Sequence, residues 1–152
     1  MGELQQEMNE DCLCEALGEL KKLQDFIIHS RTKYFGKLMA KIAGVDTIPF
    51  FLITKEEPLK LRGLIKNKDT KEEECFSTPF FRIEEFDKEN CCATVSLLLP
   101  LDIKGNFTDS ICDVMTLKRT SNCVTVDLKS ICAIQCFDVD LLKRKIIIEP
   151  KW

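Results

Sequence analysis

The sequence predicts an α+β fold that is mainly β, with an N-terminal helix or bent helix pair followed by an antiparallel β-sandwich. Between residues 9 and 44, apolar residues recur every three or four positions, which is the period of a helix. After residue 45 the period becomes two, and short runs rich in β-branched and aromatic residues alternate with turn-like segments. We therefore expect a helical segment over 9–44, a cysteine-rich β domain over 46–142 and a C-terminal tail or edge strand over 143–152.

The helical segment carries an apolar stripe that starts at Leu13 and returns at Leu17 and Leu20. Asn9 or Asp11 is expected to cap its start, because short polar side chains accept hydrogen bonds from the first free N–H groups of a helix. The stripe lapses at "HSRTK", residues 29–33, and resumes before the C-cap candidate Gly44. This interruption predicts either two helices or one bent helix.

The β segment is expected to contain three hairpins. "IPFFLIT" and "LKLRGLI" would pair around residues 55–58, and the charged stretch "NKDTKEEEC" would follow as a loop. "TPFFRIEEF" and "CCATVSLLL" flank the turn-like tetrapeptide "DKEN", and "ICDVMTLK" and "CVTVDL" flank "RTSN" in the same way. The run "KIIIEP" near the end is expected to add an edge strand.

Composition limits the classes of partner. At 152 residues the chain is long enough for one domain with its own core. Its 22 Lys and Arg against 25 Asp and Glu give a net charge of -3, which offers no general attraction to nucleic acid or to anionic lipid. The polar start lacks a secretory signal pattern, and no apolar stretch is long enough to span a bilayer, so synthesis in the cytosol is expected.

Nine cysteines are unusual for a cytosolic chain, and the odd number cannot be closed by internal bridges alone. Catalysis by a thiol needs a neighbouring base. The single histidine, His29, lies at the interruption of the helical stripe, and the chain contains no glycine-rich phosphate loop and no known nucleophile motif. We therefore expect no enzymatic activity, no catalytic residue and no cofactor.

Zinc binding is the alternative reading, as a cysteine-rich module acting as an adaptor. Structural zinc sites draw their ligands as pairs two to four residues apart on a tight turn. Cys12 and Cys14 would diverge on a helix, and Cys91 and Cys92 would point to opposite faces of a strand. Only "CAIQC", residues 132–136, has a suitable spacing, and no metal ligand is assigned.

The same directions favour crosslinks between chains. In the "RTSN" hairpin register, Cys123 lies opposite Leu117 and faces solvent. Cys132 and Cys136 share a face of a straight strand but stand roughly 13 Å apart, too far to bond each other. A competing reading is that Cys91, Cys112 and Cys132 simply fill the core, because free cysteine behaves as a small hydrophobe.

Four segments resemble a known family. "CLCEAL", "DTIPFFLITKEEPLKLRGL", "CFSTPFFRIEEFDKENCCATVSLLL" and "ICDVMTLKRTSNCVTVDLKSICAIQC" closely resemble the cysteine-rich CotY/CotZ/ExsY family of spore outer-coat and exosporium proteins. The chain departs from the family in having no cysteine in "SRTKYFGKLMAKIAG" and in continuing beyond "CAIQC" into "FDVDLLKRKIIIEPKW". We therefore expect no crosslink in the segment after the first helix, and we expect the tail to pack on its own sheet or to donate a strand to a neighbour.

The resemblance implies synthesis in the mother cell and assembly on the spore into two-dimensional lattices reinforced by disulfides between chains. The implied partners are further copies of the chain and other coat or exosporium proteins. A β-sheet that is apolar on both faces suits such packing: Phe80, Phe86, Val95 and Leu97 are expected on one face and Phe81, Ile83 and Leu98 on the other. The crosslinking candidates are Cys12, Cys14, Cys75, Cys91, Cys92, Cys112, Cys123, Cys132 and Cys136.

Overall fold

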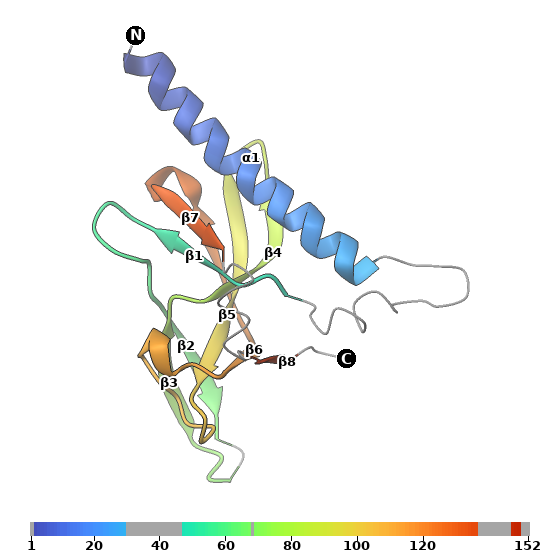
Figure 1. Ribbon diagram of the computed structural model, residues 1–152, viewed down its shortest axis with the longest axis vertical. Helices are drawn as coiled ribbons and strands as arrows, with labels where there is room; N and C mark the ends of the chain where they lie inside the picture. Colours follow the sequence, from blue (N-terminus) through green and yellow to red (C-terminus); the bar gives the residue numbers. More distant parts are fainter. Residues whose placement is uncertain (1, 30–46, 68, 137–146, 150–152) are drawn as a thin grey trace.

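The computed structural model describes residues 2–29, 47–67, 69–136 and 147–149 (Figure 1). Its helix α1 spans Gly2–His29, and two short 3-10 helices span Ile111–Asp113 (η1) and Leu128–Ser130 (η2). The strands are β1 Phe50–Ile53, β2 Leu61–Lys66, β3 Glu73–Thr78, β4 Phe81–Asp87, β5 Cys92–Leu101, β6 Thr116–Asp127, β7 Ala133–Cys136 and β8 Ile147–Glu149. The fold is α+β and mainly antiparallel β, as predicted.

The helix α1 is one continuous element of 28 residues. It starts at Gly2, so the expected caps at Asn9 and Asp11 are wrong. The residues before Asn9 are mostly Glu, Gln, Leu and Met, which have high helix propensity, and nothing in that sequence stops the helix. The expected second helical part and its end at Gly44 lie outside the described residues. None of the helices in the described part of the chain is long and apolar enough to cross a membrane.

The strands form two sheets of unequal size. The larger has six strands in the order β7-β1-β4-β5-β6-β8, and the smaller pairs β2 with β3. All pairings are antiparallel except that of β6 with β8, which is parallel. The predicted sandwich would have two sheets of similar size, whereas the second sheet here is a two-stranded hairpin.

The predicted hairpin of β1 with β2 is confirmed only at its turn, where Ile53 bridges Pro58, and the predicted pairing of the two strands is wrong. β1 lies inside the large sheet, where Phe50 is opposite both Phe81 of β4 and Cys136 of β7. Three consecutive residues of β1, Phe50–Leu52, are buried, which is typical of a strand covered on both faces. The chain reverses after β1 through a hydrogen bond from Leu59 N to Leu52 O (2.7 Å), and it then leaves the sheet to form β2.

β2 pairs instead with β3, which includes residues that the sequence assigned to a charged loop. Glu73 opposes Lys66, and Cys75 opposes Leu64. The reversal between the strands is limited to the residues around Asn67, whose carbonyl accepts a hydrogen bond from Lys71 N (2.8 Å). Glu73 and Glu74 of the acidic run "EEE" lie in β3, which is possible because this small sheet exposes most of its surface.

The hairpin of β4 with β5 is confirmed, and "DKEN" is its turn. Asp87 lies opposite Cys92, and the register runs back to Phe81 opposite Leu97, with a bulge between Ile83 and Glu85. The Asp87 carboxylate accepts hydrogen bonds from Glu89 N (3.1 Å) and Asn90 N (3.3 Å), which close the turn.

The predicted "RTSN" hairpin is wrong, because β6 runs without a break from Thr116 to Asp127. The segment "RTSN" coincides with a shift of register against β5, between Ser96 and Leu98. The Thr120 hydroxyl donates to Leu97 O (2.6 Å) at this shift. The polar residues that predicted a turn therefore lie at a bulge within a continuous strand. Residues 111–113, expected in a strand, form the 3-10 helix η1.

The large sheet is apolar on both faces, but the expected membership of the faces is partly wrong. We call the face that α1 covers the helix face and the opposite one the distal face (Figure 1). The helix face and the β2–β3 hairpin share one core cluster, which contains Leu17, Leu20, Phe50, Leu52, Phe76, Phe81, Ile83, Ala93, Val95, Leu97, Leu99, Val126, Leu128 and Ile131. The distal face carries Phe51, Phe80, Leu98, Val114 and Leu117. Phe80 was expected on the same face as Val95 and Leu97 but lies on the opposite face. Phe81 was expected opposite them but lies on their face.

Candidate crosslinking and assembly sites

Cys14 and Cys91 form a disulfide within the chain, across 77 positions of sequence. Their Cα atoms are 5.7 Å apart, a usual separation for a bridge. Cys91 closes the β4–β5 turn with a φ of 51°, in the left-handed region, and its carbonyl accepts a hydrogen bond from Leu128 N (3.1 Å). The bridge therefore joins α1 to a turn that is already fixed to η2. These two sulfurs are not available to another chain while the bond holds.

Gly18 is the position where α1 comes closest to the sheet. A Cβ atom at Gly18 would lie 3.0 Å from Cε1 of Phe86, so the missing side chain lets the ring of Phe86 pack under the helix. Leu17 beside it is fully buried. An open groove of about 670 Å³ runs along this contact and is lined by both disulfide cysteines, so small reductants can reach the bridge.

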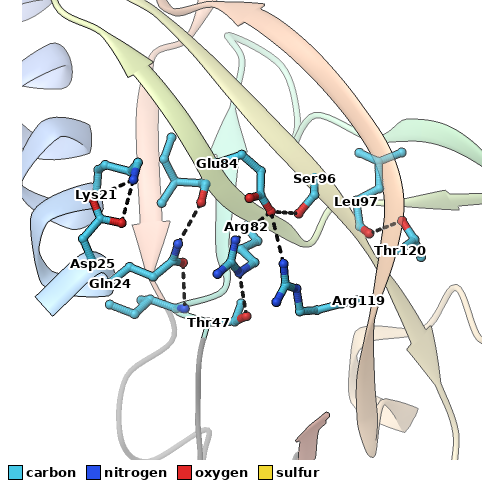
Figure 2. A network of polar contacts seen from close by, with 12 residues as sticks. Lys21, Gln24, Asp25, Thr47, Arg82, Glu84, Ser96, Leu97, Arg119 and Thr120 are labelled. Atoms are coloured by element: carbon cyan, nitrogen blue, oxygen red, sulfur yellow. Dashed lines mark hydrogen bonds and ion pairs between the residues drawn. The ribbon is translucent and has the colours of Figure 1, made fainter. Parts of the chain in front are cut away.

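A polar network lies on the distal face of the large sheet (Figure 2). The Glu84 carboxylate accepts a hydrogen bond from Ser96 Oγ (2.7 Å) and forms ion pairs with Arg82 (2.7 Å) and Arg119 (3.8 Å). Arg82 Nε also donates to the Thr47 hydroxyl (2.9 Å). Arg82 and Ser96 are almost completely buried, and buried charge is tolerated only when it is paired in this way.

The sequence reasoning missed this network. The available signal was a single arginine inside the apolar run "TPFFRIEEF" and a single serine inside "CATVSLLL", because isolated polar residues in buried strands need partners. A second buried group, Gln24 of α1, donates to Ile83 O (2.8 Å) and accepts from Ile48 N (3.3 Å). The Gln24 contacts (Figure 2) and the Cys14–Cys91 bridge thus fix two separate points of α1 on the sheet.

The other seven cysteines are free: Cys92 is half-buried, and Cys12, Cys75, Cys112, Cys123, Cys132 and Cys136 are exposed. The core-filler reading is therefore wrong for Cys112 and Cys132. All nine cysteines lie in the described part of the chain, so one internal bridge leaves an odd number of thiols on the surface.

Cys92 and Cys123 lie on the distal face, away from α1. Cys123 opposes Ser96 and not Leu117, yet it faces solvent as predicted. Cys92 follows Cys91 directly and opposes Asp127, so the two neighbouring cysteines do point to opposite faces. Between the two thiols, the hydroxyls of Thr94 and Thr125 lie 3.3 Å apart. This part of the distal face is a polar surface that carries two thiols.

Cys132 and Cys136 lie on the other edge of the large sheet. Cys132 directly precedes β7, and its N–H donates to Ile53 O (2.8 Å). Cys136 ends β7 opposite Phe50. Partial burial raises the pKa of the Cys136 thiol above its ordinary value, so this thiol is less often ionised than a fully solvated one.

Cys75 and Cys112 lie next to exposed apolar side chains. Cys75 of β3 is directly opposite Leu64 of β2, and Cys112 of η1 follows Ile111. Leu64 and Ile111 are exposed by 53% and 43%, values high enough to make them candidates for contact with another protein.

Metal binding finds no support in the geometry. The described residues contain no group of three or more His, Cys, Asp or Glu side chains that could hold a metal ion. Ala133–Cys136 form β7 directly after Cys132, so "CAIQC" does not make the tight turn that would bring its two thiols to one metal ion. His29 is the last residue of α1.

Two comparisons with known proteins, one with family models and one with single proteins, agree on one family. The family model described as spore coat protein Z matches residues 1–139. Spore coat protein Z of Bacillus subtilis (strain 168) is 35% identical over 141 residues, covering 88% of this chain and 93% of that protein. No solved structure matches the chain. The chain belongs to the spore coat protein Z family, in agreement with the resemblance carried by its cysteine-containing segments.

Proposed function

We propose that the chain is a structural protein of the bacterial endospore surface, where it assembles into a two-dimensional lattice reinforced by disulfides between chains. Membership of the spore coat protein Z family supports a place in the coat. The proposed layers are the outer coat, the crust or the exosporium. The proposed partners are further copies of the chain and other coat or exosporium proteins, with no nucleic acid, no membrane and no catalytic role.

The distribution of free thiols carries the proposal. Five of the six exposed cysteines lie on five different elements, namely α1, β3, η1, β6 and β7, and the sixth, Cys132, lies directly before β7. The fold uses one bridge, so these thiols contribute nothing to holding the monomer together. Thiols that point outward in several directions allow each subunit to be joined to more than one neighbour, which a sheet-like network requires.

Exposed apolar side chains supply contacts that do not depend on oxidation. They lie on α1, on β2 and in the segment between β5 and β6: Leu23, Phe26, Leu64, Ile103, Phe107 and Ile111. Two of them adjoin free thiols, as described for Cys75 and Cys112. A neighbour that covers such an apolar side chain also brings its own surface within reach of the thiol. We therefore infer that packing comes first and that disulfides lock it.

The order of events follows from the chemistry of the thiols. In the reducing mother-cell cytosol, exposed cysteines remain free, and the chain can diffuse to the spore as a soluble subunit. After the mother cell lyses, an oxidising environment allows bridges to form between subunits that already lie side by side. The odd number of free thiols, seven, requires at least one to remain unpaired or to bond outside its own chain.

Electron microscopy of the purified protein tests the proposal. Protein prepared with reductant should form ordered sheets or rings, and the same protein after oxidation should form the same lattice with covalent oligomers on a non-reducing gel. A protein that stays monomeric at high concentration under both conditions contradicts the lattice. One tightly held zinc per chain, found by elemental analysis of the reduced protein, would instead support the adaptor module.

A further inference from the structure

The strand β7 forms one edge of the large sheet. On one side it pairs with β1, from Ile53 opposite Ala133 to Phe50 opposite Cys136. In the described part of the chain no strand pairs with its other side. An edge strand presents unpaired N–H and C=O groups, and these can pair with a strand of another molecule.

Two free cysteines flank this edge at equal distances from its centre. Cys132 lies two residues before Ile134 and Cys136 two residues after it. Ile134 opposes Leu52 of the helix-face core, and Cys136, two residues further along β7, shares that face, while Cys132 lies directly before the strand with its N–H bonded to Ile53 O. Both are exposed, and at roughly 3.3 Å per residue they are too far apart to bond to each other.

We propose that two copies of the chain pair their β7 strands antiparallel, centred on Ile134, and close two identical disulfides between Cys132 of one copy and Cys136 of the partner subunit. The inference rests on the proposed function, since it specifies one of the contacts by which the lattice is built. The occupant of the edge is thus a second copy of this chain.

The symmetry of the spacing selects this register. In an antiparallel pair centred on Ile134, a residue two positions before the centre lies opposite the residue two positions after it. Opposite residues in antiparallel strands have Cα atoms about 4.5–5.5 Å apart, within the range of about 4.4–6.8 Å that a disulfide spans. A pair centred on Cys132 or on Cys136 would oppose only one thiol to its own copy. The register centred on Ile134 is therefore the one that uses both cysteines.

The pairing also fits the surroundings of the edge. A two-fold axis perpendicular to the sheet keeps α1 of both copies on the same face, so the two large sheets become one continuous sheet. The contact is isologous, because the same edge is used on both copies. Since it closes on itself, the lattice needs other contacts, and the thiols on α1, β3, η1 and β6 remain available for them.

The bridge forms by exchange with a low-molecular-weight disulfide such as oxidised glutathione. The thiolate of Cys132 attacks one sulfur of this disulfide, forming a mixed disulfide and releasing one small thiol. The thiolate of Cys136 of the partner subunit then attacks the Cys132 sulfur, breaking the mixed disulfide and releasing the second small thiol. Each bridge thus oxidises two protein thiols to one disulfide and reduces one small disulfide to two small thiols, which take up the two protons that the protein thiols lose.

The test uses the full chain in a background where only β7 can crosslink. In this background, Cys12, Cys75, Cys92, Cys112 and Cys123 are replaced by serine, and the Cys14–Cys91 bridge is kept. Oxidised glutathione should convert the background protein to a covalent dimer on a non-reducing gel. Peptide mapping of a mixture of ¹⁴N- and ¹⁵N-labelled chains should find residue 132 linked to residue 136 between differently labelled chains.

Two single variants then test the register. Cys132→Ser alone and Cys136→Ser alone, each in the background, should form at least tenfold less covalent dimer, because each symmetric bridge needs one residue of each kind. Mixing the two variants should restore a dimer that carries one bridge. Efficient dimers of either single variant, joined through two copies of the same cysteine, would overturn the register.

Failure of this inference can be told apart from failure of the proposed function. If the parent forms ordered sheets with covalent oligomers but the background protein gives no 132–136 bridge, the β7 contact is wrong and the lattice stands. If the background protein forms the predicted dimer but the parent never forms an ordered assembly, the contact stands and the lattice is wrong.

Discussion

At the scale of single residues, Gly18 decides how closely α1 can lie on the sheet. Its missing side chain leaves room for the ring of Phe86, which would stand 3.0 Å from a Cβ atom. We predict that Gly18→Leu lowers the free energy of unfolding by about 1–3 kcal/mol, because the larger side chain forces the helix away from Phe86. Urea unfolding monitored by circular dichroism measures this effect.

Ala16→Leu is the matched control for this substitution. Ala16 is exposed on the same helix, so the same side chain there should change the free energy of unfolding by no more than about 0.5 kcal/mol. Equal effects of the two substitutions would show that α1 does not depend on the close approach at Gly18.

Asp87 sets the β4–β5 turn that presents Cys91 and Cys92. Hydrogen bonds from the Asn90 side chain, first, and from the Asn90 backbone hold the pKa of Asp87 below its ordinary value of 3.8. The carboxylate form is therefore favoured in the folded chain. Its stabilisation is complete above the ordinary pKa and is lost as the pH falls through the lowered folded pKa.

We predict that Asn90→Ala raises the pKa of Asp87 towards the ordinary value, because the substitution removes the side-chain donor that lies 2.7 Å from Oδ2. A carboxyl titration followed by NMR measures the pKa in both proteins. An unchanged pKa in Asn90→Ala would mean that the backbone donors alone account for the shift.

The cysteines show what a sequence can and cannot reveal about individual residues. The direction of Cys123 and the opposite faces of Cys91 and Cys92 follow from strand geometry and are confirmed. The partnership of Cys14 with Cys91 does not follow, because it depends on how α1 crosses the sheet, and that crossing is set by contacts 77 positions apart in the chain. The local hydrophobic period predicts the direction in which a cysteine side chain points, but its disulfide partner depends on tertiary packing.

At the scale of elements, the Cys14–Cys91 bridge joins α1 to the β4–β5 turn. We predict that the double variant Cys14→Ser/Cys91→Ser lowers the free energy of unfolding by about 2–4 kcal/mol, since the bridge closes a long loop in the unfolded chain. Urea unfolding of both proteins without reductant measures this difference. Dithiothreitol should destabilise the parent by a similar amount, because the bridge borders an open groove.

Cys75→Ser is the control for the bridge, because Cys75 is free and exposed. Cys75→Ser should have the same unfolding midpoint as the parent in each condition, and dithiothreitol should lower both midpoints equally. A parent protein whose midpoint does not respond to dithiothreitol would contradict a stabilising role for the Cys14–Cys91 bridge.

Besides its apolar contacts, the β2–β3 hairpin is joined to the large sheet by one amide side chain. Asn122 of β6 accepts a hydrogen bond from Leu64 N (3.1 Å) and donates one to Leu64 O (2.9 Å), so it imitates a neighbouring strand. The same side chain limits the space at Gly63, where a Cβ atom would lie 2.7 Å from the ring of Phe76 and 3.0 Å from Cγ of Asn122. The missing side chain of Gly63 therefore leaves the room that Asn122 needs to lie against β2.

We predict that Asn122→Ala increases the exchange rate of the Leu64 amide proton at least tenfold and destabilises the chain by about 0.5–1.5 kcal/mol, because two hydrogen bonds are lost. Hydrogen exchange followed by NMR measures the rate. Ser121→Ala, at an exposed neighbouring position, should change neither quantity. A Leu64 amide that exchanges equally slowly in Asn122→Ala would show that the hairpin is held by its apolar contacts alone.

Elements with local signals could be predicted, and those that depend on distant partners could not. The period of α1 and the "DKEN" turn are local, and both are confirmed. β1 was assigned to its neighbour in sequence, but its partners β4 and β7 come from later in the chain. "RTSN" has the composition of a turn, yet Thr120 and Asn122 use their side chains to accommodate a bulge and to dock a hairpin.

At the scale of the whole molecule, the fold is stabilised internally and leaves most of its thiols outside. One bridge and two apolar clusters fix α1 and the strands, while six cysteines remain exposed, five of them on five different elements and Cys132 directly before β7. Exposed apolar side chains on α1, β2 and the β5–β6 segment offer packing surfaces beside some of these thiols. The central claim is that subunits assemble by packing and that disulfides then reinforce the assembly.

The most direct test of this claim is electron microscopy of a variant in which all seven free cysteines are replaced by serine and Cys14–Cys91 is kept. The account predicts that this variant still forms the ordered assembly of the parent, because packing needs no thiols. After oxidation, heating in detergent should disperse the variant completely while the parent keeps a ladder of covalent oligomers. A variant that remains folded but forms no ordered assembly would contradict the account, because the disulfides would then build the lattice.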